Sequence, residues 1–404
     1  MTRTLGTVSI ALACLALSAA TADERGACKD DGELSLPDGF CAQEVATDLG
    51  PLGQMAITGD GDIYVAVRDT EDRHGGIVGL RDTTDDGLLD EHVTFGERGA
   101  TGLALQDDRL YVSERQRILS SPLHPDRLGP GDTPRVIAHD LPDSPTPRAL
   151  LIRDDALYVG VAAQTRYCES GDNDAAGQDP CEERERAGGI WRFEARETGQ
   201  SQSRETRFAA GIRDATAMHW NPRDEHLYTV DAVPPASDSQ GATASDLLRV
   251  PESSDFGWPY CTFSTALDRH LQTVAYGGDG VSDSGCAPFQ RPLHPLSGGT
   301  EPTALLFYGG HQFPEAYRRA AFIAFNGAGD DGAQARVDLV PLDENGHPSG
   351  GQKRFADGFA DGDATAPQRL LSLAQGPEGS LFVSDSQEGT IWRVEYRGSE
   401  GDID

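Results

Sequence analysis

A short strand-like phrase that recurs six times along the chain limits the fold more than any other feature. Each copy has two or three turn residues followed by apolar positions around one aromatic residue, as in Gly61-Asp-Ile-Tyr-Val-Ala-Val67. A phrase of this composition after a turn predicts a β-strand. The aromatic residues of the six copies are Tyr64, Tyr111, Tyr158, Tyr228, Phe322 and Phe382, at spacings of 47, 47, 70, 94 and 60 residues.

The segments around each phrase predict further strands. An apolar segment usually precedes the phrase, as at 54–57 and 101–105, and another often follows it, as at 189–193 and 390–394. A unit of three or four antiparallel strands cannot bury both faces of its own sheet, so neighbouring units must stack. Six stacked units predict an all-β chain, a six-bladed β-propeller of four-stranded antiparallel blades. The alternative, a sandwich of two sheets, predicts no phrase repeated at this period.

The longer spacings between phrases hold insertions at 165–187, 232–246 and 262–300. Loops that are inserted into a rigid scaffold lie at its surface and often carry its function. We therefore expect the functional site close to these three segments.

Acidic residues strongly outnumber basic ones, with 66 Asp and Glu against 34 Lys and Arg, which gives a net charge of −32. This charge repels phosphate backbones and anionic lipids, so neither nucleic acid nor a membrane surface is an expected partner. Two of the basic residues are lysines, Lys29 and Lys353, so a mechanism through a lysine Schiff base has few candidate residues.

The N-terminus has the pattern of an export signal. Arg3 precedes an uncharged apolar run over residues 5–20, and Ala20-Thr-Ala22 matches a cleavage site. We expect a signal peptide at residues 1–22, a single propeller domain at 23–400 and an acidic tail at 401–404. No later segment is apolar over the length that a membrane span needs, so the sequence predicts a periplasmic or secreted protein.

The cysteines agree with export. Once the signal peptide with Cys14 is removed, an even number remains, which is typical of disulfides in an oxidising compartment. The sequence leaves several pairings open, although loop closure favours near neighbours. On that ground we expect three disulfides between sequence-local couples, Cys28/Cys41, Cys168/Cys181 and Cys261/Cys286.

Several motifs occur in an order that one protein family shares. They include Leu36-Pro-Asp-Gly-Phe40, Gly177-Gln-Asp-Pro-Cys181 and Asp255-Phe-Gly-Trp-Pro-Tyr-Cys261. With them the chain resembles, over 36–396, the soluble PQQ-dependent glucose/sorbosone dehydrogenases, which are six-bladed propellers of the periplasm. The resemblance implies a dehydrogenase that oxidises a sugar or a related alcohol or aldehyde, with PQQ and Ca²⁺ as cofactors. Because the chain has no Cys-x-x-Cys-His haem motif, it implies a separate electron acceptor.

The resemblance also identifies where the proton acceptor belongs. In the family a His follows a Leu-Pro pair, three residues before a basic residue, and takes the proton of the substrate hydroxyl. Here the loop runs from Leu141 to Arg148, and Pro145 occupies the His position. Proline cannot accept a proton, so the sequence predicts slow turnover unless another residue acts. His219, on the predicted strand after Arg213, is the candidate for that role.

Other positions match the family's cofactor residues. Arg213 matches the arginine of a Gly-x-Arg-Asn signature, with Asp214 in place of the asparagine, and Arg148 and Arg369 match basic positions. The resemblance therefore implies that these four residues lie at the cofactor. Two alternatives remain open: a catalytically degenerate propeller that acts as a binding or scaffold module, and a calcium-stabilised lactone hydrolase on a similar propeller.

Overall fold

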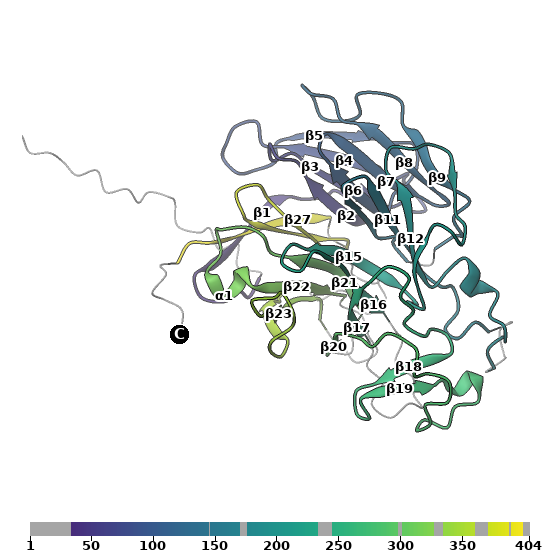
Figure 1. Cartoon of the computed structure of the whole chain (residues 1–404). Helices are drawn as coiled ribbons and strands as arrows, with labels where there is room; N and C mark the ends of the chain where they lie inside the picture. Colours follow the sequence, from purple (N-terminus) through teal and green to yellow (C-terminus); the bar gives the residue numbers. More distant parts are fainter. Residues whose placement is uncertain are drawn as a thin grey trace, which may run out of the picture.

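The computed structural model describes residues 34–144, 146–169, 176–232, 245–297, 301–326, 334–359, 371–387 and 389–398. Within these ranges almost all regular structure is β-strand, and six sheets of four or five strands form the blades of a propeller (Figure 1). This confirms the predicted all-β, six-bladed fold and excludes the two-sheet sandwich. The predicted signal peptide at 1–22 and acidic tail at 401–404 lie outside the described residues.

Blades one to three follow one another along the first half of the chain. Each begins with its innermost strand, and neighbouring strands from the inside outward are antiparallel. The strands are β2 (Leu52–Ile57), β3 (Ile63–Val67), β4 (Gly76–Arg81) and β5 (Glu91–Phe95); β6 (Gly102–Gln106), β7 (Arg109–Glu114), β8 (Arg117–Pro122) and β9 (Arg135–His139); and β10 (Leu150–Arg153), β11 (Ala156–Val161), β12 (Gly189–Glu194) and β14 (Arg207–Ala210).

Blades four to six use the second half of the chain and, in the last blade, one strand from its beginning. They are listed in the same order, from the innermost strand outward. The strands are β15 (Ala215–Asn221), β16 (His226–Ala232), β17 (Ser245–Val250) and β20 (His294–Leu296); β21 (Pro302–Phe307), β22 (Ala320–Phe325), β23 (Arg336–Pro341) and β24 (Lys353–Ala356); and β25 (Leu371–Gln375), β26 (Leu381–Asp385), β27 (Thr390–Tyr396) and β1 (Phe40–Ala46).

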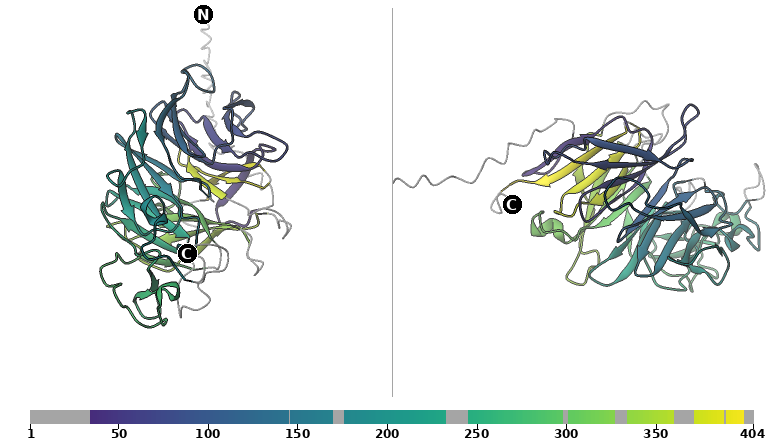
Figure 2. Two further views of the ribbon diagram at one scale, coloured as in Figure 1. Left: turned by 90° about the vertical axis from the view of Figure 1, so that its right-hand side faces the viewer. Right: turned by 90° about the horizontal axis from the view of Figure 1, so that it is seen from above.

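The inner strands form a closed ring. Each of β2, β6, β10, β15, β21 and β25 contacts the next in this order, and β25 contacts β2. The sixth blade is completed by β1, which pairs antiparallel with β27 so that Phe40 lies opposite Tyr396. In Figure 2 the C-terminal strands, in yellow, accordingly lie beside the first strands of the chain, in purple. Backbone pairing of the two chain ends closes the ring.

The repeated phrase forms the second strand of every blade, namely β3, β7, β11, β16, β22 and β26. These strands are buried on both faces; all residues of β3, β22 and β26 are buried. The reason is the stacking of blades, which covers both sides of each sheet with apolar neighbours. This is why the phrase is apolar at nearly every position instead of alternating with polar residues.

The remaining elements are short and lie outside the six regular blades. In blade two, β13 pairs in parallel with β9 and adds a fifth strand, because the chain after β12 passes along the open edge of that sheet. The short elements are β13 (Gln200–Ser201), the hairpin β18 (Cys261–Ser264) and β19 (Arg269–Gln272), the 3₁₀ turns Glu183–Glu185 and Val274–Tyr276, and α1 (Glu315–Arg318). No helix in the described ranges is long and apolar enough to cross a membrane.

Phe40, on the closing strand β1, packs in an aromatic cluster with blade five and the C-terminal strand. Its ring centroid lies 4.9 Å from that of Phe313, 4.7 Å from Tyr317, 5.1 Å from Phe355 and 5.0 Å from Tyr396. All four contacts are edge-to-face, an arrangement that adds to the stabilisation from apolar burial. Phe40 therefore fastens the N-terminal strand to two parts of the ring.

We expect Phe40→Ala to reduce the free energy of unfolding by about 3 kcal/mol, because it leaves a cavity among aromatic rings at the closure. Urea unfolding followed by tryptophan fluorescence measures this loss. Leu88→Ala, at an exposed position outside the cluster, is the control and should change stability by less than about 0.5 kcal/mol. An equal loss in both variants would contradict a special role of β1 in closure.

Candidate functional site

A cavity of about 240 Å³, called here the axial cavity, lies where the inner strands of five blades begin. At this end of the ring, polar side chains join neighbouring blades. Thr216 Oγ1 donates to the Pro302 carbonyl at 2.7 Å, and Thr303 Oγ1 donates to the Leu371 carbonyl at 2.8 Å. The cavity wall consists of Gly53, Gln54, Arg68, Thr146, Pro147, Thr216, Glu301, Pro302, Thr303, Leu371 and Ser372.

Arg68 brings an unpaired cation to the axial cavity. It follows β3, whose end lies beside the beginning of β2 because the two strands are antiparallel. Its Nε atom is buried and has no hydrogen-bond partner in the described part of the chain. Burial lowers the pKa of this guanidinium from its usual value. A buried donor without a partner is costly, so Arg68 is suited to a ligand that supplies an acceptor.

Two buried carboxyl groups, Asp214 and Asp231, meet at the entrance to blade four. Asp214 Oδ1 accepts a hydrogen bond from Thr146 Oγ1 at 3.1 Å, and the Asp214 backbone N–H donates to Asp231 Oδ1 at 2.9 Å. Thr146 also lines the axial cavity. The pair therefore connects the loop before β10 with the turn before β15 and the end of β16.

Burial above all, together with repulsion from nearby carboxylates, raises the pKa of Asp214 and of Asp231 to about 7 each. For Asp231 the repelling neighbour is Asp246, which lies directly opposite it across β16 and β17. Arg213 partly offsets both effects. A carboxyl group with a pKa near neutrality exchanges protons readily at neutral pH, which is what a general acid or base requires.

Arg213 approaches this carboxyl pair from the turn before β15. Its Nη1 donates to the Ala232 carbonyl at 3.2 Å, and its Nε is buried without a hydrogen-bond partner in the described ranges. With Asp231 and Asp246 it lines a second cavity of about 50 Å³, called here the insertion cavity. Arg213 and Asp214, which the sequence resemblance assigns to the cofactor, are thus adjacent to a pair of cavities at one end of the ring.

Arg148 has a different environment. Its side chain is buried, and one Nη atom donates to the carbonyls of Pro142 at 2.6 Å and Arg115 at 3.2 Å. Burial lowers its pKa to about 10. These bonds tie the 141–148 loop to the β7–β8 turn. Arg148 does not line the axial cavity, although its other Nη atom is buried without a hydrogen-bond partner in the described ranges. Pro145 and Arg369, the two other predicted positions, lie outside the described residues.

His219 lies within β15, three residues beyond Thr216, and lines neither cavity. Its Nδ1 is 2.9 Å from the Trp220 carbonyl, and its ring packs at 5.9 Å from Phe307. Burial lowers the pKa of His219 to about 4, so the ring is neutral at physiological pH. The structure does not bring His219 together with Arg213 and Asp214.

Sequence reasoning missed Arg68 and Asp231, although the repeat holds a signal for them. Arg68 directly follows the copy of the phrase at 61–67, and Asp231 directly follows the copy at 225–230. The second strand of each blade ends where the inner strand begins, so both residues lie at the same end of their blades. A polar residue also ends the phrase in three other blades. The polar residues at the end of the phrase are Arg68, Glu114, Asp231, Asn326 and Asp385.

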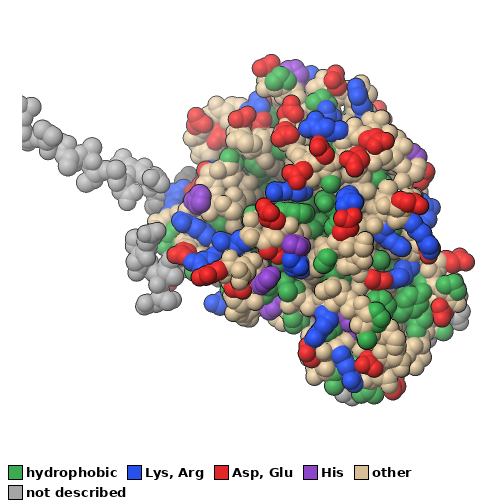
Figure 3. All heavy atoms as spheres, in the orientation of Figure 1, with side chains coloured by type: hydrophobic (Ala, Val, Ile, Leu, Met, Phe, Trp, Pro, Cys, Tyr) green, Lys and Arg blue, Asp and Glu red, His purple; other side chains and the backbone are tan. Residues whose placement is uncertain are grey.

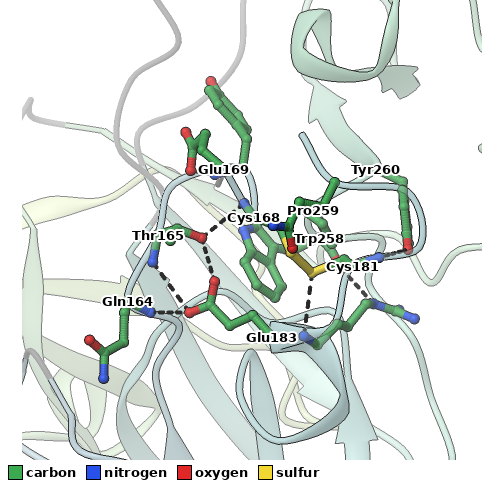
Figure 4. The surroundings of a disulfide bond; sticks show 12 residues. Gln164, Thr165, Cys168, Glu169, Cys181, Glu183, Trp258, Pro259 and Tyr260 are labelled. Carbon is green, nitrogen blue, oxygen red and sulfur yellow. Dashed lines mark hydrogen bonds between the residues drawn. A yellow bond between two sulfur atoms is a disulfide. The ribbon is translucent and has the colours of Figure 1, made fainter. Parts of the chain in front are cut away.

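The described parts of the insertion, residues 165–169 and 176–187, pack against the turn before β18 (Figure 4). Cys168 and Cys181 form a disulfide whose neighbours are Trp258 and Tyr260. Glu183 accepts hydrogen bonds from the backbone of Gln164 and from Thr165, which fixes the beginning of the insertion. Trp258 Nε1 donates to the Arg166 carbonyl at 2.8 Å. Arg166 and Trp258 line the insertion cavity together with Arg213.

Two of the predicted disulfides lie within the described ranges and are confirmed, Cys168–Cys181 and Cys261–Cys286. Cys41 is also disulfide-bonded, and its predicted partner Cys28 lies outside the described residues. Among the described residues no group of three His, Cys, Asp or Glu side chains is arranged to hold a metal ion. A Ca²⁺ site therefore stays a prediction from the sequence resemblance.

Comparison with solved structures identifies the class of fold. A Trichoderma reesei member of Carbohydrate-Active Enzymes Family AA12 matches with a TM-score of 0.72 and 15% identity, over 90% of this chain and 98% of that one. The PQQ domain of pyranose dehydrogenase from Coprinopsis cinerea matches with a TM-score of 0.73 and 12% identity, over 90% and 97%. Both structures have the fold that the sequence resemblance predicts.

A PQQ-bound aldose sugar dehydrogenase from Streptomyces coelicolor is a more distant match, with a TM-score of 0.55 and 17% identity, over 89% of this chain and 99% of that one. No protein-family model and no curated protein sequence matches the chain. At these identities the likeness shows a shared six-bladed propeller, and the site must be judged from its own residues.

The raised pKa values predict how stability depends on pH. Asp214 and Asp231 bind protons more tightly in the folded chain than in the unfolded chain, where their pKa is near 3.8. Their contribution to the free energy of unfolding is therefore greatest below pH 3.8 and is lost as the pH rises through about 7. Asp214→Asn cannot ionise, and its amide oxygen still accepts from Thr146.

We expect Asp214→Asn to raise the melting temperature at pH 8 by roughly 2–6 °C and by less than half as much at pH 5, where only part of the difference in proton binding between the folded and unfolded chains has built up. Differential scanning calorimetry at both pH values measures the difference. The control is Asp86→Asn, which changes an exposed carboxylate in the 82–90 loop and should alter neither value. Equal melting temperatures of wild type and Asp214→Asn at pH 8 would contradict the burial of an ionising group.

Proposed function

We propose that this chain is a periplasmic or secreted oxidoreductase that oxidises a hydroxyl group of a sugar or related alcohol, with PQQ bound at the axial cavity. One observation carries the proposal: a buried carboxyl pair with pKa values of about 7 lies beside Arg213, whose buried Nε has no hydrogen-bond partner in the described ranges, and Thr146 links this pair to the axial cavity that Arg68 lines. The fold is shared with proteins described as a pyranose dehydrogenase PQQ domain and a PQQ-bound aldose sugar dehydrogenase, which supports this chemistry.

An anionic cofactor at the axial cavity would draw on Arg68 in its wall and on two further arginines nearby in the fold or the sequence. PQQ carries three carboxylate groups, and each needs a hydrogen-bond donor or cation. Arg68 and Arg213 each have a buried Nε without a partner in the described ranges. Arg369 precedes Leu371, a residue of the cavity wall, by two positions. We assign the cofactor carboxylates to these three arginines, while Arg148 retains a structural role through its carbonyl contacts.

The carboxyl pair supplies the proton acceptor that Pro145 cannot provide. When bound, PQQ supplies a quinone that takes two electrons and a proton, equivalent to a hydride, from an alcohol carbon. The base, once ionised, is Asp214, which reaches the axial cavity through its hydrogen bond with Thr146, or Asp231, which lines the insertion cavity; it accepts the hydroxyl proton of the substrate. Thr146 Oγ1 and the Asp214 backbone N–H hold the two carboxyl groups in place. The proton then rests on a carboxyl oxygen of the pair.

The charges around the cavity also favour a class of substrate. Glu301 lines the axial cavity, Asp231 and Asp246 line the insertion cavity, and a net charge of −32 extends the negative potential beyond both. Neutral polyhydroxy compounds are therefore favoured over sugar acids and sugar phosphates. The predicted export signal and the disulfides support a site of action in an oxidising compartment, and the missing haem motif implies a separate electron acceptor.

The test is to titrate purified protein with PQQ and Ca²⁺, follow binding by the quinone absorbance, and then measure dye reduction with neutral aldoses. We expect Asp214→Asn and Asp231→Asn to bind PQQ but to lose about 10²–10⁴-fold in turnover, the contribution of a positioned base. Wild-type turnover should rise as the pH increases through about 7, because the ionised carboxylate is the base. Asp86→Asn, at an exposed position, is the control.

The cofactor contacts have their own variants. We expect Arg68→Ala and Arg213→Ala to weaken PQQ binding by about 10–100-fold each, because each removes a charge-assisted hydrogen bond. Arg135→Ala, at an exposed position at the beginning of β9, should bind PQQ normally. Failure of the wild type to bind PQQ would overturn the proposal and favour the binding-module alternative. Two features agree with that alternative: Pro145 stands where the family has its catalytic His, and Arg148 donates to backbone carbonyls.

A further inference from the structure

The third insertion forms a lobe that stands out from the propeller. This lobe, residues 261–293, contains the β18–β19 hairpin and projects beside blade four (Figure 1). The Cys261–Cys286 disulfide closes it, and the ring of His270 contacts those of Phe263 at 5.3 Å and Phe289 at 6.2 Å. The lobe is thus a fixed surface with a small core of its own.

Exposed apolar side chains concentrate on this lobe. Five large hydrophobic side chains in the described ranges are exposed, and four of them belong to the lobe. Figure 3 shows hydrophobic side chains gathered there, at the lower right of the view. Single exposed apolar residues are ordinary, whereas a group of them marks an interaction surface. The four are Leu267, Val274, Val281 and Leu293, with exposed fractions of 40%, 47%, 51% and 36%.

Hydrogen bonds within the lobe connect the segments that carry these side chains. Arg269, in the hairpin, donates to the Val281 carbonyl at 2.8 Å, and the Gln272 N–H donates to the Ser282 carbonyl at 3.1 Å. Arg291 donates to the Asp268 carbonyl at 3.0 Å. These bonds hold the segments of Val274 and Val281 against one strand, and those of Leu267 and Leu293 against the hairpin turn.

The lobe also differs from the rest of the chain in charge. It holds three aspartates and two arginines and therefore carries a net charge of −1, whereas the chain carries −32. Two of its charged residues, Asp268 and Arg291, form an ion pair with each other. A basic partner protein would be drawn to the acidic propeller and not to this surface. The lobe is instead the place where two such acidic chains repel each other least.

We propose that the lobe is a self-association surface and that its occupant is the lobe of a second copy of this chain. Contact between two lobes buries Leu267, Val274, Val281 and Leu293 from each chain, while the acidic propellers stay apart. Such a two-fold contact uses the same surface on both subunits, as in most homodimers. Salt screens the repulsion between the propellers and does not weaken the apolar contact.

The test is sedimentation equilibrium of the mature full-length chain at two ionic strengths. Between about 0.01 M and about 1 M salt the Debye length falls from about 30 Å to about 3 Å. We therefore expect a monomer–dimer equilibrium whose dissociation constant decreases at least tenfold in high salt. A double variant, Val274→Asp with Val281→Asp, should raise the dissociation constant at least tenfold, and both substitutions are at exposed positions that folding tolerates.

Leu88→Asp is the matched control, because Leu88 is the remaining exposed large hydrophobic side chain in the described ranges, 44% exposed, and lies on blade one. It should dimerise like the wild type. A wild type that stays monomeric in high salt overturns the proposal, and so does a dimer that the double variant leaves unchanged. A dimer weakened equally by Leu88→Asp also overturns it. Circular dichroism of each variant checks that the propeller is folded.

Discussion

The structure depends on the stacking of blades, because no blade can cover both of its own faces. Second strands such as β3 and β22 are apolar on both sides, so each must lie between two neighbouring sheets. The stacking ends when the sixth blade meets the first, and β1 makes that closure by pairing with β27. At the axis, Gln54 accepts hydrogen bonds from the backbones of β6 and β10, at 3.0 Å and 3.2 Å, and so joins three blades.

The closed ring explains why the candidate site is polar and buried at once. Antiparallel pairing brings the end of each second strand beside the beginning of each inner strand, so the residues after the repeated phrase gather at one end of the ring. Asp231 and Asp214 meet there, away from water, in a chain that is already strongly acidic. Both effects favour the protonated form of a carboxyl group. Their raised pKa values follow from the architecture of the ring together with the composition of the chain.

Two of the insertions have different roles: one forms a wall of the insertion cavity, and the other forms the projecting lobe. The segment at 165–187 and the turn before β18 pack together through Trp258 and the Cys168–Cys181 disulfide, and form a wall beside Arg213. The lobe that follows extends away from this wall, and is apolar and nearly neutral on an otherwise acidic chain. The rigid blades allow such additions, because a loop at the end of a blade changes the surface without disturbing the stacked core.

The sequence by itself predicted the blade count and the second strand of each blade, and it favoured the two near-neighbour disulfides that the described ranges contain, because apolar periodicity and short loop closure are local properties. It also led to Arg213 and Asp214 through a motif. The tertiary structure decided that Arg148 bonds to backbone carbonyls, that His219 lies deeper along β15, and that Arg68 and Asp231 reach the entrance of the ring. These placements depend on side chains that come from different blades. Their neighbours, burial and protonation exist only once the ring has closed.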